Sequence, residues 1–367
     1  MAVTNREEQI LGLIRQNPMI SQNELAHICG ITRSGVAAHI SNLVKKGYLL
    51  GKGYIVSPPT YVAVIGGINL DIYGMSVNPV VSHSSNVGKI TFSPGGIGRN
   101  ISYDLGCLGV KNYLLSVYGD DHNGAFFKKD AMANGLDITY CQQLSNTPTS
   151  TYLSVSGPDG DPMVGLDDMA SSELISPTFL RERAHIIVNA NAVVLDSSLT
   201  AASIAWICDH YSGPIYARVV SVNKASRLMP VLNRIDTLVL SRAESQLLTN
   251  TDASDEQSGQ FCARFLHEAG VRCVYLLIDG VGNLYSDGSQ YVFCPDDQRT
   301  KSRHNNGAAS AALSALLWSH SKKMGYRDCA ETAYAAAAMA MDCVQSVNPS
   351  LSPKALEARR HSFFARE

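Results

Sequence analysis

Two consecutive prolines near the N-terminus divide the chain into a short and a long part. Residues 57–60, Ser-Pro-Pro-Thr, are a turn-type stretch through which no helix continues, because proline lacks the backbone N–H and fixes φ. The next residues, Tyr61–Ile65, form a short apolar run typical of a buried β-strand. The sequence therefore predicts a small module over residues 1–56, a linker over residues 57–60 and one large α/β domain over residues 61–367.

The net charge has opposite signs in these two parts. The whole chain carries 30 basic and 32 acidic residues, a formal net charge of −2. Residues 1–56 hold six Lys/Arg and three Glu, a net of +3, which leaves 24 basic and 29 acidic residues, a net of −5, on the remaining 311. The near-neutral total therefore hides a basic module, and such a module is compatible with nucleic acid as a partner.

The short part shows the pattern of three helices followed by a β-hairpin. Apolar residues recur at helical spacing over Arg6–Gln16, Ser21 and Glu24 form a capping-box start for a second helix, and Thr32 opens a third. Residues 47–56 have the pattern of two short strands around a glycine turn. Together these elements resemble the winged helix-turn-helix family of bacterial transcription regulators.

That resemblance implies that the third helix enters the major groove of DNA. Contacts within the groove are then expected from Arg33, Ser34, His39 and Asn42, and phosphate contacts from Lys45, Lys46 and Lys52. Paired half-sites on DNA need paired modules, so a homodimer is expected. The alternative is a small interaction domain whose lysines are only solvated.

Two motifs of the large part occur in a diagnostic order. Asn69 and Asp71 follow the first predicted strand, and Ser93–Asn100, with the sequence S-P-G-G-I-G-R-N, precedes a predicted helix. Glycines after a strand let backbone N–H groups approach a ligand closely. No G-x-x-x-x-G-K-[ST] motif is present in the sequence, so a P-loop is excluded. An N-x-D motif followed by G-G-x-G-x-N resembles the ribokinase-like (pfkB-type) family of sugar and nucleoside kinases.

Longer stretches within residues 86–92, 149–154 and 165–169 look most like the pseudouridine kinases of that family. The resemblance implies a three-layer α/β/α domain with a small β lid over the sugar, which agrees with the alternation of predicted strands and helices. It also implies that ribose hydroxyls and the sugar pocket are contacted by Asn69, Asp71, Lys89, Gly95, Gly96, Asn100 and Asp168. Without the resemblance, the favoured interpretation is that Asp71 caps a turn and Asn100 caps the following helix.

The catalytic signature of the family is altered in this sequence. Members carry G-A-G-D at a helix start, where backbone N–H groups form an anion hole and the aspartate takes the proton from the attacking hydroxyl. Here Gly307, Ala308 and Ala309 stand at the anion hole, and Ser310 replaces the aspartate. A serine hydroxyl is not a proton acceptor near neutral pH, and loss of a general base typically costs about 10²–10⁴-fold in rate. Ala309 is expected to obstruct a backbone geometry that glycine adopts freely.

Three more departures fall on the nucleotide side. The N-x-x-E motif, which helps organise magnesium and phosphates in the family, begins with Ser241 and keeps only Glu244. A strand that usually ends in V-D-P carries Arg218, and Asp279 stands where a glycine is expected, where its charge would repel a triphosphate. ATP and magnesium are therefore expected only if kinase activity survives. No separate metal site is predicted, because the histidines lack ligand spacing.

Three functions remain open at this point. The first is a DNA-binding regulator whose kinase-like domain binds a nucleoside or sugar, with phosphoryl transfer lost or weak. The second is an active ATP-dependent kinase that phosphorylates a hydroxyl of pseudouridine, another nucleoside or a sugar. The third is a structural or interaction protein that keeps the fold without binding small molecules.

Cytoplasmic localisation is expected from features that are missing in the sequence. No apolar run reaches the roughly 18–20 residues of a membrane span, and the first residues lack the basic and then apolar pattern of a signal peptide. The nine cysteines lie singly, without a C-x-x-C pair, which favours reduced thiols.

Overall fold

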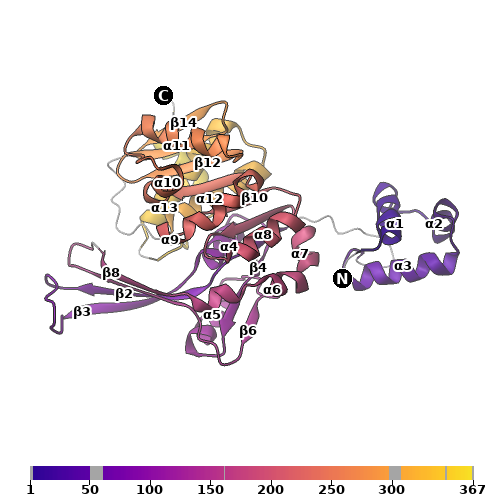
Figure 1. Ribbon diagram of the computed structural model, residues 1–367, viewed down its shortest axis with the longest axis horizontal. Helices are drawn as coiled ribbons and strands as arrows, with labels where there is room; N and C mark the ends of the chain where they lie inside the picture. Colours follow the sequence, from indigo (N-terminus) through magenta and orange to yellow (C-terminus); the bar gives the residue numbers. More distant parts are fainter. Residues whose placement is uncertain (1–2, 50–60, 161, 297–306, 344, 366–367) are drawn as a thin grey trace. The chain divides into compact units, whose positions relative to one another are not determined.

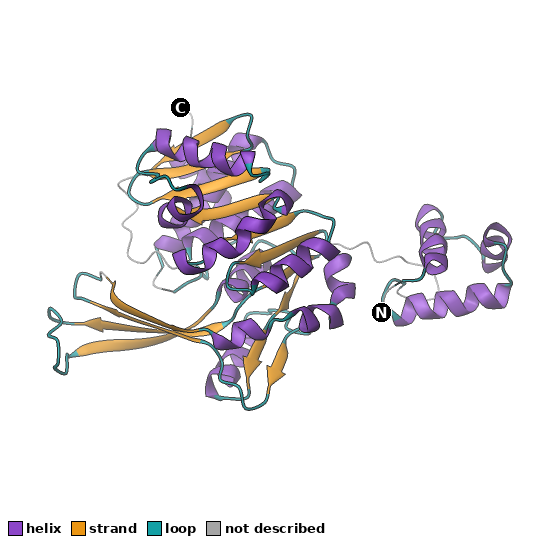
Figure 2. Cartoon of the chain, viewed as in Figure 1, coloured by secondary structure: helices purple, strands orange, loops and turns teal. Residues whose placement is uncertain are grey.

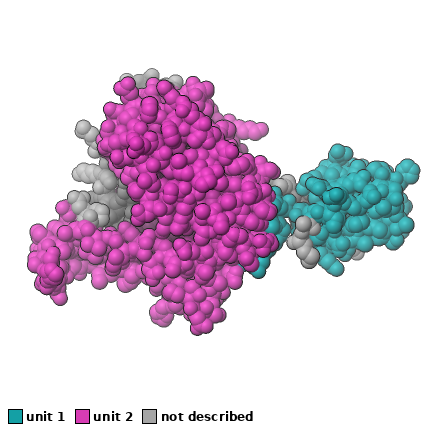
Figure 3. All heavy atoms as spheres, in the orientation of Figure 1, with its two compact units in different colours: residues 1–60, 182–190 teal, residues 61–181, 191–367 magenta. Residues whose placement is uncertain are grey.

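The computed structural model describes residues 3–49, 61–160, 162–296, 307–343 and 345–365. The chain forms two compact units, residues 1–60 with 182–190 and residues 61–181 with 191–367 (Figure 3). The predicted linker, Lys52 and most of the predicted hairpin lie outside the described residues.

The N-terminal residues form the three predicted helices, α1 (Asn5–Gln16), α2 (Gln22–Cys29) and α3 (Arg33–Lys45) (Figure 1). Thr4 and Ser21 begin α1 and α2 with complete capping boxes, which satisfy N–H groups that have no partner within the helix. The Thr32 side chain accepts the Gly35 N–H and begins α3. Apolar residues from all three helices and the segments that join them form one buried core, namely Ile10, Leu11, Ile14, Ile20, Leu25, Cys29, Val36, Ile40, Leu43 and Leu49.

The large unit is built on an eight-stranded sheet in the order β14-β13-β12-β11-β10-β9-β1-β4. The strands from β12 to β4 pair in parallel, and β13 pairs antiparallel with both β12 and the edge strand β14. The strands are β1 (Val62–Ile65), β4 (Asn112–Leu115), β9 (Ala192–Asp196), β10 (Ile215–Arg218), β11 (Thr237–Ser241), β12 (Cys273–Ile278), β13 (Gly282–Ser286) and β14 (Tyr291–Pro295). The strand order reverses at β1, and ligand sites in such sheets lie beyond the carboxyl ends of the strands at this switch point.

Helices cover both faces of this sheet, so every residue of β1, β9 and β12 is buried (Figure 2). The core on one face combines strand residues with α4, α12 and the alanine-rich α13, which packs as its composition predicts. The helices beyond α3 are α4 (Ile97–Cys107), α5 (His122–Ala133), α6 (Pro177–Glu182), α7 (Ala184–Val188), α8 (Ala201–His210), α9 (Val222–Ala225), α10 (Arg242–Thr249), α11 (Glu256–Glu268), α12 (Ala308–Ser321), α13 (Tyr326–Met341) and α14 (Pro353–Phe364), with 3₁₀ turns at Ala170–Leu174 and Ser226–Arg234. Among the described helices, none combines the length and apolar character needed to cross a membrane.

A second, four-stranded sheet has the order β3-β2-β7-β8 and is the predicted lid (Figure 1). Its strands are β2 (Asn69–Ser76), β3 (Gly88–Gly95), β7 (Thr151–Ser156) and β8 (Pro162–Asp168), and a further pair consists of β5 (Val117–Gly119) and β6 (Gln142–Leu144). Tyr152 is the register partner of both Asp71 and Asp167, and partners share a face of a sheet. One face of the lid therefore presents polar residues. The observed architecture confirms the predicted α/β fold with a small β lid and an N-terminal helix-turn-helix module.

Candidate functional site

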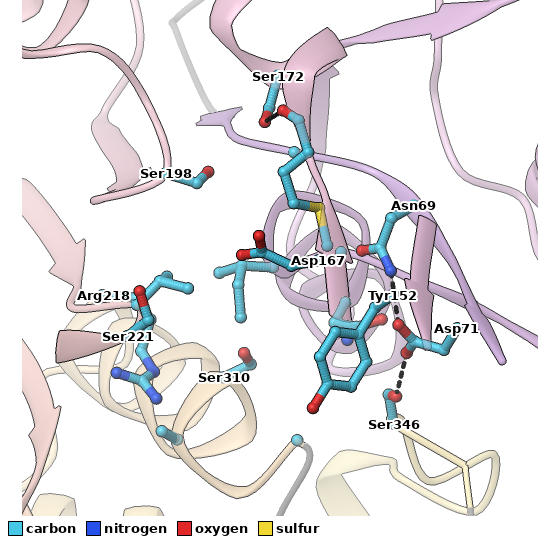
Figure 4. A pocket seen from close by; sticks show the side chains of 18 of the residues that line it. Asn69, Asp71, Tyr152, Asp167, Ser172, Ser198, Arg218, Ser221, Ser310 and Ser346 are labelled. Carbon is cyan, nitrogen blue, oxygen red and sulfur yellow. Dashed lines mark hydrogen bonds between the residues drawn. The ribbon is translucent and has the colours of Figure 1, made fainter. Parts of the chain in front are cut away.

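The carboxyl ends of β1, β9 and β10, the lid and the N-terminus of α12 surround a cavity of about 300 Å³ (Figure 4). Seven of the residues predicted for the site line it, although the sequence places them in two widely separated segments: Asn69, Asp71, Gly96, Asn100, Gly307, Ala309 and Ser310. Arg218, singled out as a charge reversal, also lines it. The motif predicted to contact sugar and the altered G-A-A-S motif therefore meet in a single cavity.

Asp71 is the centre of the hydrogen bonding on the lid side of the cavity. Its Oδ1 accepts a hydrogen bond from Asn69 Nδ2 (2.5 Å), and its Oδ2 accepts from the hydroxyls of Tyr73 (3.0 Å) and Ser346 (3.0 Å). Asn69, Asp71 and Tyr73 alternate along β2, so they share the face that lines the cavity. A carboxylate has about four lone-pair sites. A pair of sugar hydroxyls must therefore share Asp71 with Tyr73 and Ser346 or replace them.

Burial raises the pKa of Asp71, which is only 7% exposed, and the hydrogen bonds from Asn69, Ser346 and Tyr73 offset part of that rise. Desolvation disfavours the charged form of a carboxyl group. The fold thus holds this carboxylate at a cost in stability, as is common for groups kept for ligand contact.

Two glycines allow the backbone to approach this side closely. A side chain at Gly95 would overlap the Asp71 carboxylate, so the absence of a side chain there leaves room for Asp71. Gly95 was predicted to line the sugar pocket, but it does not line the cavity. Gly96 has φ +97°, and a Cβ there would meet the Gly67 carbonyl and Ile68. It begins α4, whose first turn carries Asn100 into the cavity. Asn100 Oδ1 accepts from Arg99 (3.2 Å), which leaves its amide NH₂ as the donor for a ligand.

Two predicted sugar contacts lie elsewhere. Lys89 is exposed near the far end of β3 and does not line the cavity. Asp168 lines only an adjacent hollow, whereas its neighbour Asp167 lines the cavity and forms an ion pair with Lys224 Nζ (3.2 Å). Side chains alternate along a strand, so a shift of one residue decides which carboxylate faces the cavity. Asp167, and not the predicted Asp168, therefore lines the cavity.

The opposite side of the cavity is the N-terminus of α12. Gly307 precedes the helix, and a Cβ there would overlap the Ser346 carbonyl. The backbone N–H groups of Ala308, Ala309 and Ser310 have no acceptor among the described residues, as expected in a first helical turn. Ala308 itself does not line the cavity. Ser310, where the family has its aspartate, is 2% exposed and lines the cavity.

Ala309 does not have the expected strain. It lies in the first turn of a regular α-helix and is absent from the residues with positive φ. Any L-residue adopts helical φ and ψ without penalty. The expected obstruction by its Cβ is therefore wrong, and the anion-hole N–H groups keep a helical arrangement.

Arg218 binds Glu244, the glutamate retained from the family's N-x-x-E motif. Its Nη1 donates to Glu244 Oε2 at 2.8 Å, in an ion pair whose side chains are 13% and 7% exposed. The same Glu244 oxygen accepts the Ser241 N–H (2.7 Å) at the start of α10. Neither Ser241 nor Glu244 lines the cavity. Glu244 therefore pairs with the Arg218 guanidinium and caps the start of α10.

The described residues do not fit a magnesium–nucleotide complex. Magnesium in such sites is held by one or two carboxylates together with substrate phosphates, yet the retained Glu244 is held in an ion pair with Arg218. Burial and, to a smaller extent, the charge of Asp279 raise the pKa of Asp296.

In the N-terminal unit, four of the predicted DNA contacts are exposed on α3: Arg33, Ser34, Asn42 and Lys45. His39 is half-buried, and its Nδ1 has no partner among the residues described. Lys46 forms an ion pair with Glu7 at 2.7 Å. Burial alone would raise the pKa of Glu7, but hydrogen bonds from Lys46 and Thr4 lower it to about 2. Lys46 therefore links α3 to α1, a different role from the predicted phosphate contact.

The sequence-based prediction missed several cavity residues, including Tyr73, Tyr152, Ser198, Lys224 and Ser346. Tyr73 had a usable signal, because it follows Asn69 and Asp71 at period 2 on one strand. Tyr152 lies next to Asp71 because β7 pairs with β2, and Ser346 contacts Asp71 from a segment 275 residues further along the chain. Neither arrangement leaves a local pattern in the sequence.

Comparisons with known proteins agree with this geometry. Residues 59–353 match the pfkB family of carbohydrate kinases, and residues 4–49 match a winged helix-turn-helix DNA-binding family. An uncharacterized sugar kinase of Escherichia coli K12, YeiI, is 33% identical over 95% of this chain and 97% of its own length. The pseudouridine kinase of the same organism is 31% identical over 80% of this chain and 94% of its own length.

Solved structures show the same fold. Arabidopsis thaliana ribokinase, determined with ribose and ATP, has a TM-score of 0.71 and 18% identity, and the match covers 82% of this chain and 98% of that protein. The family match covers more than half of the chain and includes both sides of the cavity. The chain therefore belongs to the pfkB family of carbohydrate kinases and carries a winged helix-turn-helix domain at its N-terminus.

Proposed function

We propose that this protein is a DNA-binding regulator whose pfkB-type domain binds a nucleoside or sugar, with phosphoryl transfer lost or weak. The observation that carries the proposal is the composition of the α12 side of the cavity. Ser310 stands at the position of the general base, and Arg218, which also lines the cavity, holds Glu244 in an ion pair. The lid side keeps Asn69 and Asp71 of the sugar motif. Recognition is thus supported without the groups that transfer a phosphoryl group.

The exposed residues of α3 support the DNA-binding part. Arg33 and Lys45 lie at the two ends of the helix, with Ser34 and Asn42 between them. Guanidinium and amide side chains on such a helix can bind base edges, and lysines add salt-dependent phosphate contacts.

The outer face of the lid supports a homodimer. The register pairs Ile72 with Phe92, Gly74 with Ile90, Leu153 with Leu166 and Val155 with Val164 on the face opposite Asp71. Phe92, Ile90, Leu166 and Val164 are each more than half exposed. A contiguous apolar face of this kind favours a protein partner. A second copy of the chain is the occupant we propose, because it also pairs the DNA-binding modules.

An active ATP-dependent kinase is the second candidate. The relatives named above are called kinases, and the N–H groups at the start of α12 remain as potential donors to a transferring phosphate. In that case the proton of the attacking hydroxyl would have to pass to water, and positioning would supply most of the catalysis.

DNA binding by the full-length chain tests the first candidate. Fragments of the source genome are selected on the protein, and the affinity of the best fragment is measured against salt with and without a panel of nucleosides and sugars. We expect salt-dependent binding, and at least one ligand that changes the affinity by about 5–150-fold.

A double variant, Arg33→Ala with Lys45→Ala, should weaken DNA binding and reduce the salt slope by about 1 for each phosphate neutralised by these two side chains. Lys129→Ala, an exposed lysine on α5, is the matched control and should bind as the wild type. Absence of DNA binding at low salt would contradict the regulator, and binding that no ligand changes would contradict the sensor.

A further inference from the structure

We propose that the ligand of this cavity is a phosphate monoester of a sugar or nucleoside, with its sugar hydroxyls at Asn69 and Asp71 and its phosphate between Ser310 and Arg218. The inference deepens the proposed function and rests on it, since it names the chemical class that the ligand-binding domain senses. It differs from a nucleoside or sugar kinase substrate, which would carry a free hydroxyl at the Ser310 end.

The two ends of the cavity have opposite hydrogen-bonding character (Figure 4). Asp71 on the lid side is an acceptor, and sugar hydroxyls are donors. Ser310 and Arg218 lie on the other side and are donors. A sugar phosphate has the matching arrangement, with donor hydroxyls at one end and an anion with several acceptor oxygens at the other.

Ser310 is a buried donor without a partner. The residue is 98% buried, its hydroxyl has no hydrogen-bond partner among the described residues, and it lines the cavity. The N–H groups of Ala308, Ala309 and Ser310 are also without acceptors there. The hydroxyl and the helix start therefore offer donors to the same cavity, and a bound anion can accept hydrogen bonds from both.

Arg218 has donors left over after its ion pair. Only Nη1 donates to Glu244, and Nε is buried without a partner in the described part of the chain. A guanidinium offers five N–H donors in a planar fork that suits phosphate oxygens. Lys224 lines the same cavity and forms its ion pair with Asp167, a half-exposed carboxylate, at 3.2 Å. Two cations and a helix start therefore line the same cavity.

The substitutions that remove kinase features favour this anion. A phosphate monoester carries about −1.5 to −2 charges at pH 7. Aspartates at positions 218 and 310, which the family pattern has, would repel it at close range. In this chain those positions are an arginine and a serine.

Calorimetric titration of the full-length chain with matched pairs tests the proposal. The pairs are pseudouridine, uridine, guanosine and ribose, each with its 5′- or 5-phosphate, and inorganic phosphate is a separate probe. Two charge-assisted hydrogen bonds predict that the phosphate ester of the best pair binds at least about tenfold more tightly than its parent. A parent that binds as tightly as its phosphate ester, or more tightly, overturns the proposal.

Introduction of a negative charge at position 310 identifies the phosphate contact. Ser310→Asp should remove the preference for the phosphate ester, because it adds a negative charge. Ser310→Asn is the control, since asparagine has the size of aspartate without the charge, and it should keep most of the preference. The double variant Arg218→Gln with Glu244→Gln removes the cation without leaving a buried charge, and it should also remove the preference. It provides the same readout if Ser310→Asp does not fold, as judged by thermal unfolding.

The outcomes separate this inference from the proposed function. Binding of a parent nucleoside or sugar without a gain from phosphate keeps the ligand-binding function and overturns the inference. Absence of binding by every parent and every ester overturns both. Binding of inorganic phosphate alone, unaffected by Ser310→Asp, also overturns the inference, because it locates the anion elsewhere.

Discussion

The lid side and the α12 side of the cavity are built from different chemistry. On the lid side, Asp71 accepts hydrogen bonds from Asn69, Tyr73 and Ser346, and its partners are neutral. On the α12 side, the retained Glu244 is held in an ion pair with Arg218, and Ser310 offers a hydroxyl where the family has a carboxylate. The lid side therefore offers the Asp71 carboxylate to the cavity. On the α12 side, one carboxylate position is Ser310 and the other carboxylate, Glu244, is paired with Arg218.

This difference separates recognition from catalysis within one fold. Sugar recognition needs acceptors in fixed positions, and β2 still provides them through its period of two. Phosphoryl transfer needs a proton acceptor and a metal–nucleotide complex, and the side chains that would supply them are replaced or neutralised here. The proposed regulator requires only sugar recognition.

The largest effect is expected from breaking the Arg218–Glu244 pair. Arg218→Leu leaves Glu244 buried with the Ser241 N–H as its remaining described partner, and we expect the free energy of unfolding of the large unit to fall by about 3 kcal/mol. Denaturant unfolding measures the change. Adding Glu244→Gln should recover most of it, and a single variant as stable as the wild type would show that the pair is not formed.

On the lid side, Asp71→Asn should act on binding and not on stability. We expect the affinity for the best nucleoside or sugar to fall about 10²-fold, because hydrogen bonds to a charged acceptor are removed, while the unfolding free energy stays the same or rises, because burial disfavours this charge. Titration calorimetry and unfolding measure both quantities. Asp168→Asn, one residue outside the cavity lining, is the control and should change neither.

The pH dependence of binding should follow Asp71. Burial raises its pKa above the ordinary value of 3.8, so the carboxylate protonates at a higher pH than an exposed aspartate. As pH falls through that pKa, the affinity for an uncharged sugar should decline by up to about tenfold per pH unit. Titration from pH 7 to pH 4 measures this decline. An Asp71→Asn variant with the same pH profile would show that another group is responsible.

Ala309→Gly should have the smallest effect. Because Ala309 is helical, the substitution is expected to lower the unfolding free energy by about 1 kcal/mol and to leave ligand affinity and ATP turnover unchanged. Enhanced turnover in this variant would indicate that the alanine does obstruct the anion hole.

The parts of the fold that depend on local patterns could be predicted from the sequence. The capping residues Ser21 and Thr32 marked helix starts correctly, and the apolar run at Tyr61–Ile65 marked β1. The glycines of the S-P-G-G-I-G-R-N motif indicated a close approach of backbone, which the structure shows at Gly96 and its contact with Gly67.

Interactions between distant segments could not be predicted in this way. The sequence showed Arg218 as a charge reversal, but its partner Glu244 lies beyond the next strand and reaches it because β10 and β11 are adjacent and parallel. Lys46 is a second example. It was predicted to contact DNA phosphates, but it forms an ion pair with the distant Glu7 on α1. Ala309 was misjudged because a family preference for glycine was applied to a position that is helical here.

ATP consumption by the wild-type chain tests the central claim most directly. The full-length protein is incubated with ATP, magnesium and each member of a nucleoside and sugar panel, with the pseudouridine kinase of Escherichia coli as the positive control. We predict no ligand-dependent ATP consumption above the protein-free background, because Ser310 cannot take the proton and Glu244 is held by Arg218. Rapid turnover with any member of the panel would contradict the claim and identify the protein as a working kinase.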